Sequence, residues 1–364
     1  MSETLISNSS DLLIHLSTAS DGDIVLLAPG NYGSIELKDL DFSEYVTIRS
    51  LDPKDPAVFD DLDITSSSHI RLDSIHVSSP SNGGQGSELL GINGSHFIEV
   101  VNSEINGLID SEVPITGYFG IHADGESSNV RIEGNYIHDV KNGTAMFGVE
   151  DLELVSNTFE FIGEDTMKFA SVTNALIENN TGPQYICAKV DAHEDFMQFQ
   201  GSGSTNVVIR GNVFLPQNVH DIQGIHIKGS SDSSNFLIEQ NIFYTQMANG
   251  VNAETFADGL IIRDNTFLNS GTGSNGVTTI RNAPADSIIQ NNITTSWDTG
   301  WYGDGNISVQ VTDSNGEWYV GNHFSNPLNA EQITVHDIVP LPGSPLEGKG
   351  AYERLIELLF DLPR

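Results

Sequence analysis

The chain has 364 residues, 38% of them hydrophobic, and its 15 Lys and Arg stand against 50 Asp and Glu, a net charge of −35. This balance disfavours a nucleic-acid partner and an anionic membrane surface, since no basic surplus exists to pair with phosphates. It favours solubility in a salty medium. The single cysteine, Cys187, excludes an internal disulfide. The sequence contains no run of about 18 apolar residues, so it does not predict a membrane-spanning helix.

The N-terminal residues predict a cap followed by β-structure. The start lacks the basic region and cleavage site of a classical signal peptide. Residues 9–19, "SSDLLIHLSTA", place Ser and Asp before an apolar run, which predicts a capped helix covering the open base of a coil. Residues 22–40, "GDIVLLAPGNYGSIELKDL", and 45–50, "YVTIRS", predict the first strands.

A repeat follows, in which a short β-rich run leads to Asn and then usually to another apolar residue. Successive members are separated by 22, 23, 32, 29, 24, 27 and 30 residues. This spacing favours a β-solenoid with one coil per repeat, the Asn side chains stacking at one corner in left-handed backbone geometry. The repeated asparagines are Asn135, Asn157, Asn180, Asn212, Asn241, Asn265, Asn292 and Asn322.

We therefore predict an all-β fold, a single right-handed parallel β-helix of about ten coils, over residues 1–325 including the N-terminal cap. Residues 326–364 form a C-terminal linker and an amphipathic helix that either caps the last coil or binds another subunit. The apolar face of this helix would carry Leu355, Leu358, Leu359 and Leu362.

One strand of each coil forms a column of polar side chains. When these strands are aligned on their inward Ile, Met or Val, the outward positions carry ionisable, amide and aromatic groups, which suit sugar hydroxyls and a sugar carboxylate. We predict a glycan-binding groove along this face; the alternative is a solvated sheet. The outward residues are His122, Asp124, Phe147, Lys168, Gln198, Gln200, His226, Lys228, Asn252, Glu254, Thr278 and Arg281.

The opening strands and the Asn-cornered coils resemble the pectate-lyase-like superfamily, and within it the chondroitinase B and alginate lyase family. That resemblance implies a Lys base, an Arg acid one coil later and a calcium ion held by acidic residues. Residues 278–292 are similar to the Arg-bearing coil, which makes Arg281 the acid. The preceding coil departs from the pattern, because it has Asn252 and Glu254 where the Lys should be, and Lys228 lies further back.

The stretch "KVDAHEDFMQFQG", residues 189–201, contains a candidate metal site. Asp191, His193 and Asp195 alternate, so an extended segment would place all three on one side, although calcium or a transition metal needs further ligands. "DAHE" also resembles the D-P-H-E/D signature of mannuronan C5-epimerases, but here it precedes the strand. We expect no organic cofactor.

Two functions remain open. The first is an enzyme that binds and depolymerises an acidic polysaccharide, as a lyase, or else as a hydrolase or C5-epimerase. Lys168, His226, Lys228, Glu254 and Arg281 are the candidate catalytic residues; Asp195 with Glu254 would be a hydrolase pair. The alternative is a non-catalytic phage tailspike or other virion protein that binds host glycan, forms a homotrimer and works outside the cell.

Overall fold

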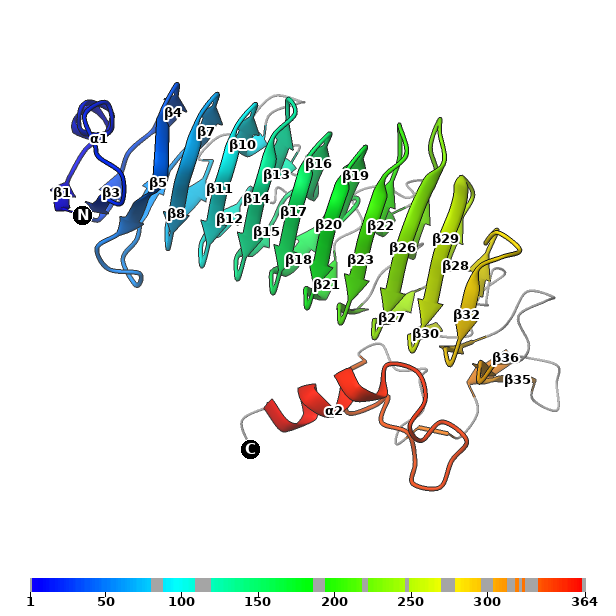
Figure 1. Ribbon diagram of the computed structural model, residues 1–364. Coiled ribbons are helices and arrows are strands. Elements are labelled where there is room, and N and C mark those ends of the chain that lie inside the picture. Colours follow the sequence, from blue (N-terminus) through cyan, green and yellow to red (C-terminus); the bar gives the residue numbers. More distant parts are fainter. Residues whose placement is uncertain are drawn as a thin grey trace. The chain divides into compact units, whose positions relative to one another are not determined.

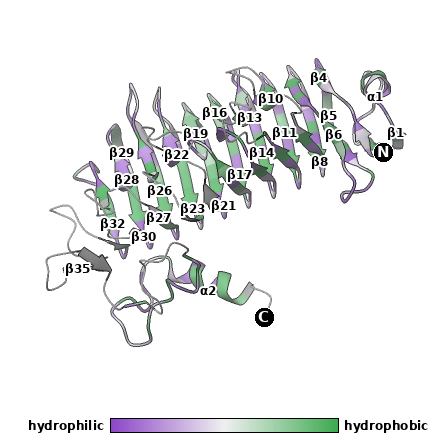
Figure 2. Ribbon diagram, turned by 180° about the vertical axis from the view of Figure 1, so that it is seen from behind, coloured by the Kyte–Doolittle hydropathy of each residue, from purple (hydrophilic) through white to green (hydrophobic). Residues whose placement is uncertain are grey.

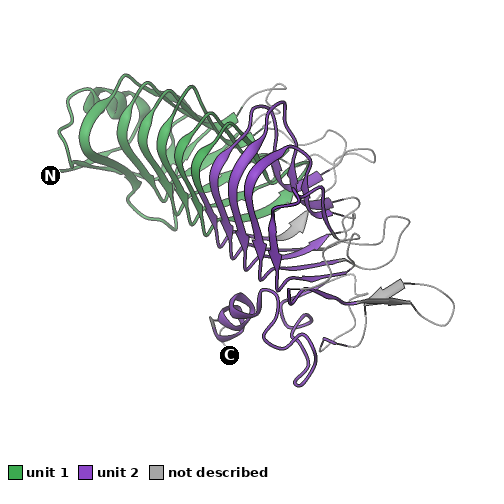
Figure 3. Ribbon diagram, turned by 45° about the vertical axis from the view of Figure 1, so that its right-hand side comes forward, with its two compact units in different colours: residues 1–175 green, residues 176–364 purple. Residues whose placement is uncertain are grey.

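The computed structural model describes residues 2–79, 88–108, 119–185, 194–217, 222–245, 249–269, 279–295, 304–312, 318–320, 323–324 and 333–361. The chain divides into two compact units, residues 1–175 (unit 1) and 176–364 (unit 2), shown in Figure 3. In both units short strands follow one another around a coil, and each strand pairs in parallel with its equivalent in the next coil (Figure 1). The predicted fold class, a right-handed parallel β-helix, is confirmed.

Unit 1 contains three parallel sheets, A1, B1 and C1, visited in that order in each coil. Sheet A1 comprises β1 (Glu3–Ile6), β2 (Ile24–Leu27), β5 (Asp41–Ser50), β8 (Ser68–Asp73), β11 (His96–Val101), β14 (Ser128–Glu133) and β17 (Glu150–Val155). Sheet B1 comprises β3 (Gly30–Asn31), β6 (Ala57–Phe59), β9 (His76–Ser78), β12 (Glu104–Asn106), β15 (Tyr136–His138) and β18 (Thr158–Ile162). Sheet C1 comprises β4 (Ser34–Lys38), β7 (Asp61–Thr65), β10 (Glu88–Asn93), β13 (Phe119–Asp124), β16 (Asn142–Phe147) and β19 (Met167–Ala170).

Unit 2 repeats the arrangement in sheets A2, B2 and C2, after β20 (Thr173–Glu178), which contains the unit boundary. Sheet A2 comprises β23 (Thr205–Arg210), β26 (Ser233–Glu239), β29 (Phe256–Arg263) and β32 (Ile288–Gln290). Sheet B2 comprises β21 (Thr181–Tyr185), β24 (Val213–Gln217), β27 (Ile242–Thr245), β30 (Thr266–Asn269), β33 (Ile293–Thr294) and β34 (Ile307–Ser308). Sheet C2 comprises β22 (Glu194–Phe199), β25 (Ile222–Ile227), β28 (Asn249–Ala253) and β31 (Thr279–Arg281). An antiparallel pair, β35 (Gln310–Thr312) and β36 (Trp318–Val320), follows.

Strand alternation places the apolar residues inside the coils, and Figure 2 shows hydrophobic and hydrophilic residues alternating along the strands. In unit 2 the interior of sheet B2 contains a row of rings. Phe214, Phe243 and Phe267 lie in register on β24, β27 and β30 and are fully buried. Their ring centroids are 5.7 and 5.4 Å apart, so each coil packs directly against the next.

The predicted Asn stack forms the corner between the A and B sheets. In unit 2 the backbone N–H and the side-chain amide of Asn241 both donate to Oδ1 of Asn265, each over 3.0 Å. The same pattern joins Asn212 to Asn241. At the end of the described stack Asn292 donates to Asn306, whereas the predicted member Asn322 lies outside the described residues.

The prediction that these asparagines adopt the left-handed backbone conformation is wrong by one residue. The residue before each stacked Asn has positive φ, for example Gln240 at 56° and Asp264 at 54°. The Asn itself is turned inward and buried, where its amide satisfies the backbone groups of the bend. The corner therefore needs two residue types in sequence, one that tolerates the bend and one that hydrogen-bonds across it.

The predicted N-terminal helix is present as α1 (Ser9–Leu16). It is capped by Asn8, whose side chain accepts from the Asp11 N–H, and it buries Leu12 and Leu16. The strand β1 before it is an element that the sequence pattern did not predict. The helix and its preceding strand thus begin unit 1 together.

The predicted C-terminal helix is present as α2 (Tyr352–Asp361), which belongs to unit 2. It lies along the side of several coils there, because its Leu355 packs in one cluster with residues of β24, β27 and β30. Leu358 and Leu359 pack against that cluster as predicted, whereas Leu362 lies outside the described residues. The predicted domain boundary at residue 325 stays a prediction.

Candidate functional site

Sheet C2 brings four of the predicted polar residues into one row. Gln198 on β22 pairs with His226 on β25, His226 with Asn252 on β28, and Asn252 with Arg281 on β31. Their inward neighbours Met197, Ile225 and Val251 are fully buried, as the column predicted. Since adjacent strands are about 4.8 Å apart, the four side chains lie side by side on the outward face.

His226 is held between two carboxylates. Its Nδ1 lies 3.6 Å from Oδ2 of Asp195, and its Nε2 lies 3.5 Å from Oε1 of Glu254. The side chain of Asp195 is completely buried, that of His226 is 15% exposed and that of Glu254 is 38% exposed. The adjacent Asp195 carboxylate raises the pKa of His226; burial opposes this shift and Glu254 adds to it. A buried carboxylate thus orients an imidazole whose charged form is favoured.

Amide side chains extend this site on both sides. Nε2 of Gln198 donates to Oδ2 of Asp195 over 2.9 Å, so that oxygen serves two residues of the row. Nδ2 of Asn252 donates to Oε1 of Glu254 over 3.0 Å, and Asn282 donates to Oδ1 of Asn252 over 2.7 Å. Hydrogen bonds therefore hold the side chains of Gln198, Asn252 and Glu254 in place before any ligand binds.

Two buried amides at the start of the neighbouring strands were not among the predicted residues. Gln223 pairs with Asp195 across β22 and β25, and Asn249 on β28 donates to the Gln223 side chain. Oδ1 of Asn249 has no hydrogen-bond partner among the described residues, although Asn249 is only 9% exposed. The sequence holds a signal for them, because both amides directly precede the strand glycine in "QGIH" (223–226) and "NGVN" (249–252).

Other predicted residues lie at the margin of the row. Gln200, Lys228 and Glu254 follow the last inward residue of their strands and are exposed. Thr278, Asp191 and His193 lie outside the described residues, so the predicted metal ligands stay a prediction. Within the described ranges no group of three His, Cys, Asp or Glu side chains has the arrangement of a metal centre.

The remaining candidates belong to sheet C1 of unit 1. His122 pairs with Ala145 and Ala145 with Lys168, so the outward neighbour of His122 on β16 is Ala145, and Phe147 lies two residues further along. Nζ of Lys168 is 3.0 Å from Oδ2 of Asp165 in a mostly buried ion pair. The charge of Lys168 is therefore compensated within its own unit.

The comparisons with known proteins bear on the fold alone. The sequence matches no protein-family model and no curated protein. Among solved structures, an alginate lyase from Paenibacillus sp. str. FPU-7 has a TM-score of 0.55 and 15% identity over 79% of this chain and 98% of its own.

Two further structures show the same similarity. PfbA, a surface adhesin of Streptococcus pneumoniae, has a TM-score of 0.53 and 12% identity over 86% of this chain and 95% of its own. The Dettilon tailspike protein has a TM-score of 0.51 and 13% identity over 82% of this chain, which spans 62% of that protein. No helix in the described part of the chain is long and apolar enough to cross a membrane. This chain shares its parallel β-helix with proteins named as lyases, adhesins and tailspikes.

Proposed function

We propose that the protein is a carbohydrate-active β-helix protein that binds and depolymerises an acidic polysaccharide through the outward face of sheet C2, outside the cell or on a virion. The observation that carries the proposal is His226, partly exposed between the buried Asp195 and the exposed Glu254. An imidazole with an orienting carboxylate is a proton-transfer group in many unrelated enzymes.

A role for each neighbour follows from its chemistry. The neutral form of His226 accepts the C5 proton and returns it to the departing glycosidic oxygen. Asp195 positions the ring without touching substrate, because its side chain has no exposed surface. Arg281 and Lys228 are exposed cations that neutralise a uronate carboxylate, which acidifies the C5 proton that a lyase removes. Gln198, Gln200 and Asn252 bind hydroxyl groups.

The burial of Asp195 argues against the alternative chemistry of a hydrolase. Two carboxylates must reach the glycosidic bond or its attacking water. Glu254 is exposed, but Asp195 lies beneath His226 and Gln198. Calcium remains an expectation from the family resemblance, and no step is assigned to it.

The experiment is incubation with alginate, polygalacturonate and chondroitin sulfate, followed at 232 nm for unsaturated products and by a reducing-end assay. We expect products from one substrate, and at least a tenfold loss, about 1.4 kcal/mol, in kcat/KM for His226→Gln and for Lys228→Ala. His138→Gln, on sheet B1, is the matched control and should retain full activity.

A second candidate function is glycan binding without cleavage, by an adhesin or tailspike. It is favoured by the similarity to PfbA and the Dettilon tailspike, which concerns the fold only. Binding of a panel polysaccharide without any product, together with the solution mass of a trimer, would establish this function. Absence of both binding and cleavage would overturn both proposals.

A further inference from the structure

The imidazole between two carboxylates is built a second time, in unit 1. The sequence Gly-Ile-His recurs at 120–122 and 224–226, and both histidines occupy the outward row of a C sheet. Nδ1 of His122 lies 4.0 Å from Oε1 of Glu88, and its Nε2 lies 3.9 Å from Oδ2 of Asp124. As in unit 2, one carboxylate comes from the preceding strand.

The surroundings of His122 differ from those of His226 in their aromatic rings. The ring centroids of Phe119 and Phe147 lie 5.1 and 5.3 Å from that of His122, and the two phenyl rings are perpendicular to each other. Phe119 is buried, whereas Phe147 is partly exposed. A phenyl ring beside hydrogen-bonding carboxylates is the combination that binds the apolar and polar faces of a sugar.

The positions beside the imidazole in the row are occupied by small, buried residues. Gly91 and Ala145 are the neighbours of His122 in the row, one on each side. A Cβ atom on Gly91 would lie 2.3 Å from Oδ1 of Asp63, so the Asp63 carboxylate extends over that glycine. The row thus presents an imidazole with carboxylates reaching in from the preceding strands.

The charge of this face is opposite to that expected for an acidic-sugar site. Its outward carboxylates outnumber its cations; Lys38 is 3.6 Å from Glu36, and Lys168 is engaged by Asp165. Burial raises the pKa of Asp61 to about 6, and the nearby carboxylates of Asp63 and Glu88 add to this shift. An anionic sugar would be repelled here and a cationic one attracted. The outward carboxylates are Glu36, Asp61, Asp63, Glu88 and Asp124.

We propose that the outward face of sheet C1 around His122 is a second saccharide site, which takes a sugar bearing a protonated amine. Asp63 and Glu88 bind the ammonium group, His122 and Asp124 bind hydroxyls, and Phe147 packs against the C–H face of the ring. This site stands independently of the activity proposed for sheet C2.

The test uses two probes that differ only in the amine. Isothermal titration of the folded full chain with a tetramer of β-1,4-linked glucosamine should show binding, and the N-acetylated tetramer should bind at least tenfold more weakly. Asp63→Asn, which preserves shape, and Phe147→Ala should each weaken binding of the amine tetramer at least tenfold. His226→Gln should leave it unchanged, which separates this site from the one in unit 2.

A net charge of −35 could attract any oligocation, so two controls are needed. Glu150→Gln removes one exposed acid from sheet A1 of the same unit and should not alter binding. Spermine should bind without sensitivity to Phe147→Ala. The proposal is overturned if the amine tetramer does not bind, if both tetramers bind equally, or if Asp63→Asn and Phe147→Ala bind as the wild type does while their thermal unfolding is unchanged.

Discussion

At the scale of single residues, Asn241 shows how a coil corner is stabilised. Its amide donates to the backbone oxygens of Ile209 and Glu239 over 2.9 and 3.0 Å, in addition to its bonds with Asn265. Its Oδ1 accepts two hydrogen bonds from Asn212. The residue is fully buried, so these groups have no access to water as a substitute partner.

The substitution Asn241→Leu is expected to lower the free energy of unfolding by about 3 kcal/mol, because it leaves several buried donors and acceptors unpaired. Gln290→Leu, at an exposed position of β32, introduces the same side chain and should change stability by less than about 0.5 kcal/mol. Urea unfolding of both variants measures the difference. Equal stability of the two variants would show that the Asn stack contributes nothing.

His226 predicts a pH dependence of stability. Its pKa is raised in the folded state, so its stabilising contact with Asp195 is fully present below the unfolded pKa of about 6.5 and is lost as the pH rises through the folded value. The melting temperature of unit 2 should fall over this range in the wild type, and His226→Gln should flatten that part of the profile. A slope that survives in the variant would assign the effect to another group.

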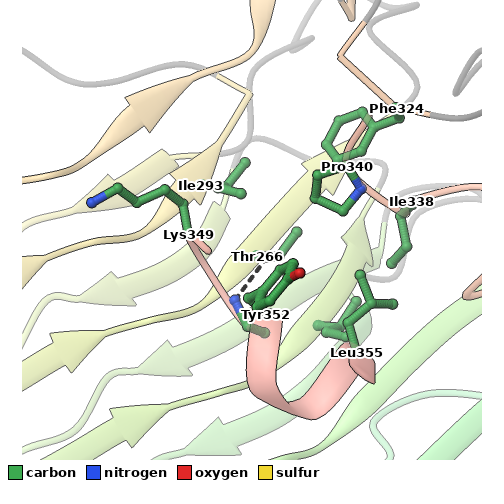
Figure 4. Close-up of a pocket in the computed structure, with 10 residues that line it drawn as sticks. Thr266, Ile293, Phe324, Ile338, Pro340, Lys349, Tyr352 and Leu355 are labelled. Carbon is green, nitrogen blue, oxygen red and sulfur yellow. Dashed lines mark hydrogen bonds between the residues drawn. The ribbon is translucent and has the colours of Figure 1, made fainter. Parts of the chain in front are cut away.

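At the scale of elements, the C-terminal segment joins neighbouring coils of unit 2 from the side. The backbone N–H of Gly350 donates to the backbone oxygen of Asn291, and the backbone N–H of Ala351 donates to Oγ1 of Thr266. Nε of Arg354 donates to the backbone oxygen of Gly211. Figure 4 shows the Thr266 contact beside the small, mainly apolar cavity that the segment encloses against the coils. Each bond reaches a different coil, so the segment fixes their relative positions.

Leu355 anchors α2 in this arrangement. It is 4% exposed and packs against the same cluster as Ile242 and Ile293. Leu355→Ala should therefore cost about 2–4 kcal/mol, since it removes apolar contact and leaves a cavity. Phe360→Ala is the matched control, because Phe360 is 73% exposed on the same helix and should be nearly neutral. If denaturant unfolding gives similar values for both, α2 is not part of the folded unit in solution.

At the scale of the whole molecule, the excess of acids governs the response to salt. Only 15 basic residues are present for 50 acidic ones, so most carboxylates repel one another without compensation. Raising NaCl from about 0.1 M to about 2 M shortens the Debye length from about 10 Å to a few ångströms and should raise the melting temperature. A melting temperature that falls or stays constant would mean that paired charges outweigh the repulsion.

The sequence by itself determined the coil and its register. Alternating strands fixed which side chains face inward, and the recurring Asn fixed where each coil turns, because both are local properties repeated at every step. Strand alternation and repeat spacing are therefore sufficient to place Gln198, His226, Asn252 and Arg281 in one row. The sequence pattern assigns the left-handed backbone conformation to the stacked Asn, whereas the residue before it adopts that conformation. Repeat spacing alone does not distinguish the residue that forms the bend from the Asn whose amide stabilises it.

Only the tertiary structure decided what each polar side chain contacts. Strand alternation and repeat spacing do not indicate that Asp195 is buried beneath His226 or that Lys168 pairs with Asp165. The path of α2 along the coils was equally open. These contacts join residues of neighbouring strands and coils, and loop lengths and local strand irregularities decide which of them meet. The distances between them and the burial of their side chains are therefore known only from the stacked coils.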